Sequence, residues 1–271
     1  MQAGFYAAAG GMVAQFNRLD VISNNLANLN TNGYKRDDLV FGDYLRLSKE
    51  SEDELPLANQ TKAAAKFLNR TIDRVPHVVE EYTNWSLGGM MKTNNPLDLA
   101  LAKEDRFFMV LTPAGVRFTR DGAFVLSEDG TLTTREGFPV LPNDYFRNRR
   151  TIQLDRSSVI NIDKNGNIQA KNAEGVMVPV ATLFVAKFRE QRQLEKIGQN
   201  LYRSPEAEPV SSNGEGVILQ GYLEKSNVNP VSEMIGLIET NRMVSMYQKV
   251  MDAHMNDLNN DAINKLATTR A

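Results

Sequence analysis

The sequence predicts an α+β fold. Long N- and C-terminal helices pack as a coiled-coil-like assembly domain, and an antiparallel β domain is inserted between them. Two observations support this prediction. Apolar residues repeat every seven positions near both ends of the chain, and in the middle they alternate with polar residues. A seven-residue repeat is typical of helices that pack side by side, whereas strict alternation is typical of half-buried strands.

An amphipathic helix is predicted near the N-terminus. The members of its apolar row are Phe5, Met12, Leu19 and Leu26, with Ile22 and Leu29 three residues after two of them. Residues three or four apart share one helix face. The helix should end near the segment NTNG, because Asn and Gly33 accept the left-handed conformation found after a helix C-terminus.

Asparagines flank this row in the segment DVISNNLANLNTNGYKR, residues 20–36. Asn24, Asn25 and Asn28 lie one to two turns before the expected helix end, so a role in ending the helix does not explain them. An amide donates and accepts hydrogen bonds without the desolvation cost of a full charge. We therefore predict that these side chains hydrogen-bond to neighbouring subunits.

A second, longer helix is predicted near the C-terminus. Asn229 is a suitable N-cap, and Pro230 suits the first turn, where its missing N–H is not needed. The pattern then runs for about 35 residues, or roughly 50 Å. The expected interface residues are Met234, Leu237, Asn241, Val244, Gln248, Met251, Met255 and Leu258.

The sequence divides into three regions. Residues 1–40 and 226–271 form the predicted assembly domain. Residues 97–225 form the predicted β domain, in which Asp121-Gly122, Asp129-Gly130 and Asn165-Gly166 mark hairpin turns between short apolar runs. Residues 41–96 are expected to connect the two, with a charged loop at 48–54, a short helix within 61–75 and a loop at 86–96.

Composition excludes several classes of protein. The net charge of −2 argues against a strongly basic nucleic-acid-binding surface. The absence of cysteine excludes disulfides, Cys-ligated zinc and thiol catalysis. No apolar run approaches the ~20 residues of a spanning helix. The first 17 residues carry no Lys or Arg, so a cleaved secretory signal is not expected.

Candidate chemical sites are few. His77 precedes Glu80 and Glu81, but a second His at metal-ligand spacing is missing, and His254 lies on the predicted C-terminal helix. A calcium loop is the main alternative: Asp163, Asn165, Asn167 and Glu174 occupy its ligand positions 1, 3, 5 and 12. Position 6 should be Gly but is Ile168, which argues against calcium. We predict no catalytic site, metal or cofactor.

Three segments identify a family. ISNNLANLNTNGYKR (22–36) resembles the N-terminal motif of bacterial flagellar rod, hook and hook-associated proteins, and SNVNPVSEMIGLIETNRMVSMYQKVM (226–251) resembles their C-terminal motif. FTRDGAFVLSEDGTLTTREGFPVL (118–141) is similar to a β segment of the rod and hook members. Within the family, GYLEKSNVNPVSEM favours the proximal rod protein. The N-terminal motif matches the distal rod protein as well, and a rod-like paralogue stays open.

The resemblance implies a structural subunit of the flagellar basal-body rod, located in the periplasmic space and exported unprocessed by the flagellar type III apparatus. Its partners would be other copies of itself, neighbouring rod proteins and that export apparatus, without nucleic acid or membrane insertion. In this family the terminal helices pack between subunits and the β domain faces outward. A ligand- or calcium-binding β module with a coiled-coil stalk is the alternative from another class of protein.

Overall fold

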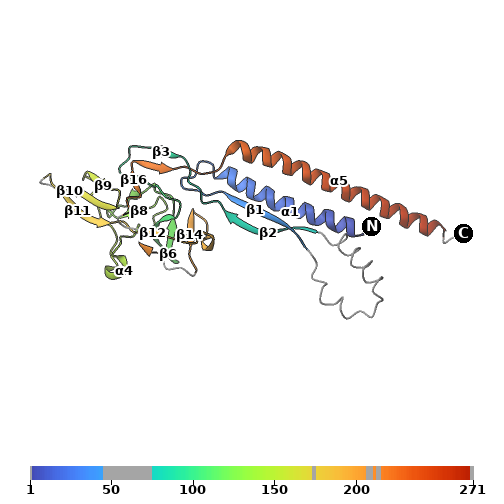
Figure 1. The fold of residues 1–271 in the computed structure, drawn as a ribbon, viewed down its shortest axis with the longest axis horizontal. Coiled ribbons are helices and arrows are strands. Elements are labelled where there is room, and N and C mark those ends of the chain that lie inside the picture. Colours follow the sequence, from blue (N-terminus) through green and yellow to red (C-terminus); the bar gives the residue numbers. More distant parts are fainter. Residues whose placement is uncertain (1, 45–74, 173–174, 206–209, 212–214, 269–271) are drawn as a thin grey trace. The chain divides into compact units, whose positions relative to one another are not determined.

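The computed structural model of the chain describes residues 2–44, 75–172, 175–205, 210–211 and 215–268 (Figure 1). The chain divides into two units. The first, which we call the helical unit, comprises Met1–Leu26, Asp37–Tyr82 and Pro230–Ala271. The second, the β unit, comprises Ala27–Arg36 and Thr83–Asn229. The segment Ala27–Arg36 therefore belongs to the β unit, although it begins at the last residue of the N-terminal helix.

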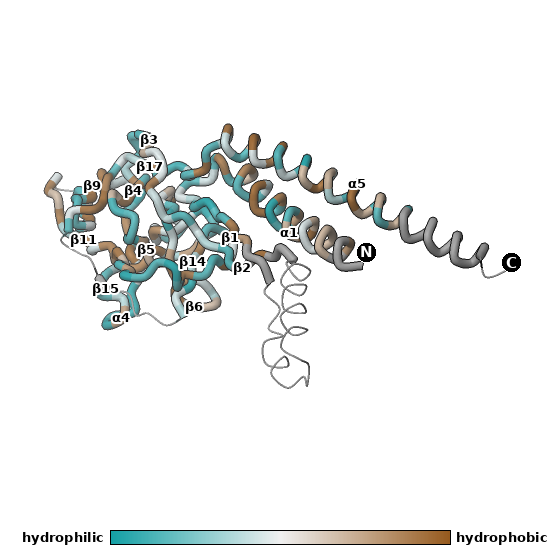
Figure 2. Tube along the Cα trace, turned by 45° about the vertical axis from the view of Figure 1, so that its right-hand side comes forward, coloured by the Kyte–Doolittle hydropathy of each residue, from teal (hydrophilic) through white to brown (hydrophobic). Residues whose placement is uncertain are grey.

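Two helices dominate the helical unit, α1 (Gln2–Ala27) and α5 (Pro230–Thr268), and both views show them side by side (Figures 1 and 2). They run antiparallel. A Cβ added to Gly11 would meet the Tyr247 ring, whereas Gly236, eleven residues before Tyr247, lies against Ile22, eleven residues after Gly11. Residues of α1 and α5 thus contact each other within the helical unit.

The helix ends follow local sequence. The start predicted at Pro230 is confirmed, and proline fits there because the first N–H groups of a helix have no intrahelical partner. α1 ends at Ala27, a few residues before the NTNG segment. Gly33 adopts the predicted left-handed conformation, with φ of +67°.

The helical unit also contains a two-stranded sheet of β1 (Asp37–Tyr44) and β2 (Val75–Thr83). These strands were not predicted, since they lie in the regions predicted as terminal helix (1–40) and connection (41–96). Their pairing joins segments more than 30 residues apart, which a local pattern does not reveal. The charged loop at 48–54 and most of the helix expected within 61–75 lie outside the described residues.

The β unit is built around a six-stranded sheet with the order β13-β14-β6-β5-β12-β15, and every pair in it is antiparallel. Its members are β5 (Arg106–Thr112), β6 (Gly115–Thr119), β12 (Val185–Lys187), β13 (Glu195–Lys196), β14 (Leu201–Arg203) and β15 (Val210–Ser211). Successive residues of β5 enter two different cores. Phe108 and Val110 pack in one, and Phe107 and Met109 in the other. Burial on both faces explains the unbroken apolar run FFMVL.

The described part of the β unit also contains smaller antiparallel sheets and two short helices. The three-stranded sheet contains β9 (Ile160–Ile162), β10 (Asn167–Lys171) and β11 (Met177–Thr182). The two-stranded pairs are β3 (Met90–Lys92) with β17 (Tyr222–Glu224), β4 (Leu99–Leu101) with β16 (Ile218–Gln220), and β7 (Val125–Leu126) with β8 (Leu132–Thr133). The short helices are α4 (Tyr145–Asn148) and the 3₁₀ turn η1 (Gln191–Gln193). Strand β3 corrects the loop predicted at 86–96.

Two of the three predicted hairpin turns are confirmed. Gly130 lies between β7 and β8 with φ of +76°, and Gly166 lies between β9 and β10 with φ of +88°. The prediction for Asp121-Gly122 is wrong, because the strands on either side, β6 and β7, belong to different sheets. Gly122 is required there by close packing: a Cβ would lie 1.7 Å from the backbone oxygen of Leu99.

The predicted combination of helices with antiparallel sheets is confirmed. The coiled-coil-like packing of the terminal helices as an assembly domain stays a prediction. None of the helices in the described ranges has both the length and the apolar character that crossing a bilayer requires.

Candidate functional site

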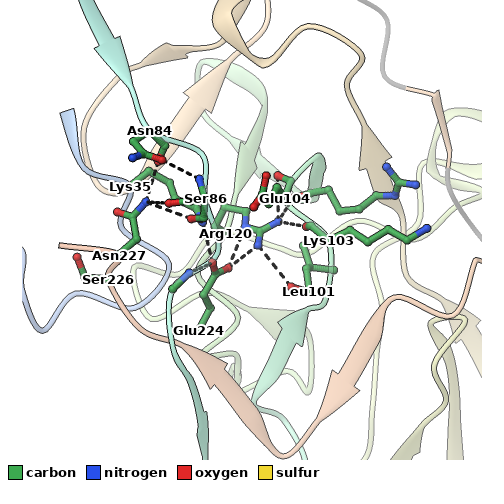
Figure 3. Close-up of polar contacts among 12 residues, drawn as sticks. Lys35, Asn84, Ser86, Leu101, Lys103, Glu104, Arg120, Glu224, Ser226 and Asn227 are labelled. Atoms are coloured by element: carbon green, nitrogen blue, oxygen red, sulfur yellow. Dashed lines mark hydrogen bonds and ion pairs between the residues drawn. The ribbon is translucent and has the colours of Figure 1, made fainter. Parts of the chain in front are cut away.

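Three of the sequence motifs meet in the interior of the β unit. Lys35 belongs to NTNGYKR, Arg120 to FTRDG and Glu224 to GYLEKS. None of the three is more than 1% exposed. Figure 3 shows the Glu224 carboxylate between the two cations. We call Lys35, Arg120 and Glu224 the buried charge cluster.

Each oxygen of Glu224 has a charged partner. Oε1 lies 2.7 Å from Lys35 Nζ, and Oε2 accepts hydrogen bonds from Nε and Nη2 of Arg120 at 2.9 and 2.6 Å. The backbone N–H of Gly88 also donates to Oε1, at 3.0 Å. A buried carboxylate is tolerated only with such partners, so these groups together compensate the burial of the Glu224 charge.

Arg120 also holds the backbone between β4 and β5. Its Nη1 donates to the carbonyl oxygens of Lys103 and Arg106, each at 2.6 Å (Figure 3). Nη2 makes a longer contact of 3.4 Å with the carbonyl of Leu101. A single guanidinium therefore connects this segment to Glu224 on β17, a role that its planar fork of donors suits better than a lysine would.

The segments next to both terminal helices are hydrogen-bonded to each other and to the rest of the β unit. We call them the root segments: residues 28–36, which follow α1, and residues 225–229, which precede α5. Asn227 connects them: its Oδ1 accepts a hydrogen bond from Arg36 N–H at 2.8 Å. Gly33 N–H donates to the Glu224 carbonyl at 2.7 Å, and Asn200 Nδ2 donates to the Asn32 carbonyl at 2.6 Å. The NTNGYK segment is therefore bound into the β unit through its backbone as well as through Lys35.

The buried charge cluster contains two cations and one carboxylate, and these surroundings lower the pKa of Lys35. Burial lowers the pKa of Lys35 from 10.5 to about 8, and the nearby Arg120 cation lowers it further, while Glu224 opposes both effects. Below pH 8 the folded protein therefore contains a buried ammonium that its surroundings disfavour. Between pH 8 and 10.5 the folded state releases this proton more readily than the unfolded state does.

We predict that this difference makes stability depend on pH. Because the unfolded chain binds more protons in that window, the contribution of Lys35 to the free energy of unfolding should rise from pH 8 to pH 10.5, by at most ~1.4 kcal/mol per pH unit. Urea unfolding of the wild type and Lys35→Met at several pH values measures it. The wild type should gain stability relative to the variant as the pH rises. A constant difference between the two would contradict the lowered pKa.

On α1, the predicted apolar row is not the most buried face. Its members Phe5, Met12, Leu19 and Leu26 are half-buried, as is Leu29 after the helix, and only Ile22 is fully buried. The other fully buried residues of α1 are small or polar: Ala8, Gly11, Ala14 and Asn25. A Cβ on Gly11 would lie only 2.6 Å from the Tyr247 ring, so small residues let α5 approach closely. A search for large apolar residues misses such a face.

The three asparagines have different environments. Asn25 is buried, and its amide exchanges two hydrogen bonds with the backbone of Asp37: Nδ2 donates to the carbonyl at 2.9 Å and Oδ1 accepts from N–H at 3.1 Å. Its Nδ2 also lies 3.5 Å from Glu233 Oε2 on α5. These bonds lie within one chain and join α1, β1 and α5. Asn24 is exposed, and Asn28 is half-buried and accepts a hydrogen bond from Thr31.

On α5, the predicted residues are divided between buried and exposed faces. Val244 is buried, and Leu237 and Met251 are half-buried, so this row faces inward. Asn241, Gln248, Met234 and Met255 are exposed. The side chain of Leu258 lies outside the described residues.

Each helix also has a row of exposed residues that mixes large apolar with polar side chains. The outer face of α5 consists of Ile235, Ile238, Arg242, Met246 and Lys249, and the outer face of α1 consists of Val13, Phe16, Asp20 and Asn24. Of these, Asn24 was a predicted interface residue and Phe16 belongs to the predicted helical pattern, whereas the others were not predicted. All of these residues are exposed and recur at intervals of three and four, which places them on one stripe. A search for a second helical period in the same segments would have found them.

The segment considered as an alternative calcium loop, which begins at Asp163, forms a hairpin turn. Both oxygens of Asp163 accept hydrogen bonds inside the turn, Oδ1 from the N–H of Asn165 and Asn167 and Oδ2 from Asn167 Nδ2. The amide oxygens of Asn165 and Asn167 accept from Gly216 N–H and Thr182. Glu174 and the side chain of His77 lie outside the described residues. Within the described part, acidic and His side chains nowhere gather in threes to hold a metal.

Comparison with known proteins matches three parts of the chain to flagellar families. Residues 5–35 match the family described as flagella basal body rod protein, residues 103–170 match the flagellar hook protein FlgE/F/G D1 domain, and residues 219–264 match the flagellar basal body rod FlgEFG protein C-terminal family. Lys35 and Glu224 of the buried charge cluster fall in the first and last of these, and Arg120 in the second.

Curated relatives match over nearly the whole chain. The flagellar basal-body rod protein FlgG of Buchnera aphidicola subsp. Acyrthosiphon pisum is 32% identical over 88% of this chain and 90% of its own length. FlgG of Agrobacterium fabrum is 31% identical, over 90% and 92%. The rod protein FlgF of Rhizobium meliloti is 30% identical, over 89% of each. FlgG and FlgF relatives thus differ little in identity, and the preference for the proximal rod protein stays a prediction. The chain belongs to the flagellar basal-body rod protein family.

Proposed function

We propose that this protein is a structural subunit of the flagellar basal-body rod that assembles through its terminal helices and transmits torque. Its partners are other copies of itself and neighbouring rod proteins, and it reaches the rod through the flagellar type III apparatus without losing a signal peptide. It needs no cofactor and performs no catalysis. Family membership supports the place in the rod. The surface of the helical unit supports the mode of assembly.

The observation that carries the assembly proposal is the outer face of α5. Ile235, Ile238 and Met246 are 53%, 54% and 60% exposed, although α5 already packs against α1 on another side. A helix that is apolar on two sides is typically buried on both. Full burial of such a side chain contributes about 1.5–3 kcal/mol, so a neighbouring helix would stabilise the assembly substantially.

The proposal assigns the two units different roles. The helical unit forms the contacts between subunits, and the β unit binds the root segments within its own fold. Many modest contacts, repeated over many subunits, carry a mechanical load without loading any one of them heavily. The predicted interface residues that lie on the inward face, such as Val244, contribute by holding α1 and α5 together.

We predict that deleting the gene in a flagellated cell abolishes spreading in soft agar, and that wild-type protein supplied from a plasmid restores it. Without this subunit the rod should be incomplete, so basal bodies purified from the mutant should lack the hook. Electron microscopy of the basal bodies checks this directly. A motile deletion strain with an intact rod and hook would refute the proposed function.

A further inference from the structure

Exposed methionine is concentrated on one helix of this protein. The chain contains 11 methionines and no cysteine, so methionine is its only sulfur-containing residue type. Within the described part of the chain, two exposed methionines belong to the β unit, Met91 and Met177. The other exposed ones all lie on α5, and we call them the α5 methionines: Met234, Met243, Met246 and Met255.

The α5 methionines are open to small reagents in solution. Met246 is 60% exposed, and the exposure of the other three ranges from 40% at Met243 to 53% at Met234. Met109 on β5 gives the contrast, since it is 0% exposed and packs in a core beside Phe107. The same residue type therefore occurs in this chain both fully accessible and fully enclosed.

The thioether sulfur of methionine reacts with hydrogen peroxide. A lone pair of the sulfur attacks one peroxide oxygen, the O–O bond breaks, an S–O bond forms and the other oxygen leaves as water. The sulfur loses two electrons and the peroxide gains them, so the step needs no further reagent. Because the sulfur must meet the peroxide, the α5 methionines should react far sooner than Met109.

Oxidation changes the property of α5 on which assembly depends. Methionine is flexible and apolar, whereas its sulfoxide is polar. Burying the sulfoxide oxygen against a neighbour without a hydrogen-bond donor is unfavourable. If neighbouring subunits cover α5, oxidised subunits should therefore assemble poorly. The same neighbours should keep peroxide away from the sulfur atoms once a subunit is in place.

We infer that the α5 methionines form a redox-sensitive modification site, which hydrogen peroxide oxidises in the free subunit and which assembly protects. The inference rests on the proposed function, because it requires that neighbouring subunits cover α5. The modification is reversible: methionine sulfoxide reductases return the sulfur to the thioether, and the oxygen leaves as water. An oxidised subunit is thus excluded from the rod until it is reduced.

Mass spectrometry of peptides measures the oxidation of each methionine with time in dilute hydrogen peroxide. In the purified free subunit, the α5 methionines should oxidise at least about tenfold faster than Met109. In purified basal bodies, the α5 methionines should oxidise at least about tenfold more slowly than in the free subunit. N-acetylmethionine added to both samples reports the peroxide dose. Equal rates in the two samples would overturn the inference.

Substitutions test the effect on assembly. Replacing all four α5 methionines with Leu keeps apolar side chains of similar size that peroxide does not oxidise, whereas replacing them with Gln makes the same positions permanently polar. In the deletion strain, the Leu variant should restore spreading in soft agar and the Gln variant should not. The control Met91→Gln/Met177→Gln places the same change on the β unit and should spread like the wild type. Because the α5 methionines are exposed, the melting temperature of the free Gln variant should change little.

The outcomes separate the inference from the proposed function. If the α5 methionines are not protected in basal bodies, or if the Gln variant restores spreading, the redox-sensitive site is wrong while the rod function stands. If the deletion strain is motile with an intact rod and hook, the rod function itself fails. The measurement of protection uses wild-type protein, so it decides the inference whether or not a variant folds.

Discussion

Replacing Glu224 with Gln should lower the free energy of unfolding of the β unit by about 3–5 kcal/mol, because it removes the carboxylate that both Lys35 and Arg120 face. Two cations would then stay buried without a counter-charge. Trp85, the sole tryptophan, lies in the aromatic core of the β unit, so its fluorescence during urea unfolding reports on this change. The midpoint should move to a markedly lower urea concentration.

Two control variants show what is special about Glu224. Lys35→Met removes one cation and leaves Glu224 paired with Arg120, so it should cost much less than Glu224→Gln. Glu195→Gln breaks the pair with Arg203, whose side chains are about half exposed, and should cost less than about 1 kcal/mol. Equal losses from Glu224→Gln and Glu195→Gln would show that the buried charge cluster contributes no more than a surface ion pair.

Replacing Gly33 with Ala should destabilise the protein by more than about 2 kcal/mol, for two separate reasons. Gly33 has a φ of +67°, where a side chain costs roughly 1–2 kcal/mol. In addition, an added Cβ would lie 2.5 Å from the backbone carbon and oxygen of Arg120. Since these are backbone atoms, they cannot move aside without displacing the residue that anchors Glu224. Urea unfolding monitored by Trp85 fluorescence measures the loss.

Gly137→Ala separates the two reasons. Gly137 has a φ of +88°, but an added Cβ would meet no atom within 4 Å in the described part of the chain. This variant should therefore show the cost of the backbone conformation alone. The excess loss in Gly33→Ala measures the close packing of the NTNGYK segment on Arg120. If both variants lose the same stability, that packing contributes nothing.

Structural features that depend only on a few neighbouring residues were predictable from the sequence. Pro230 marked the start of α5, and Asp129-Gly130 and Asn165-Gly166 marked turns, because proline and glycine restrict or extend the backbone wherever they stand. The same argument failed at Asp121-Gly122. There glycine is required because the backbone of Leu99, more than 20 positions away, packs against Gly122. The dipeptide Asp121-Gly122 does not reveal which distant residue will pack against the glycine.

Pairings between distant segments were not predictable from local patterns. Strand β3 looked like a loop because MMK is short and lies between Gly and Asn residues; it becomes a strand by pairing with β17, about 130 residues later. The buried face of α1 was misjudged because its small residues acquire their role from the Tyr247 ring on α5. In both places a partner far along the chain overrides the local signal.

The sequence by itself determined that helices lie near both ends of the chain, that antiparallel strands lie in the middle, and which family the chain belongs to. Seven-residue repeats, alternation and motif residues all involve residues that are close together in the sequence. Only the tertiary structure decided what the motif residues do. Lys35, Arg120 and Glu224 are spread over 190 residues, and folding brings them together out of water, where charges must be paired. It also decided which helix faces are buried within the chain and which stay exposed, since burial depends on the neighbour that each face meets.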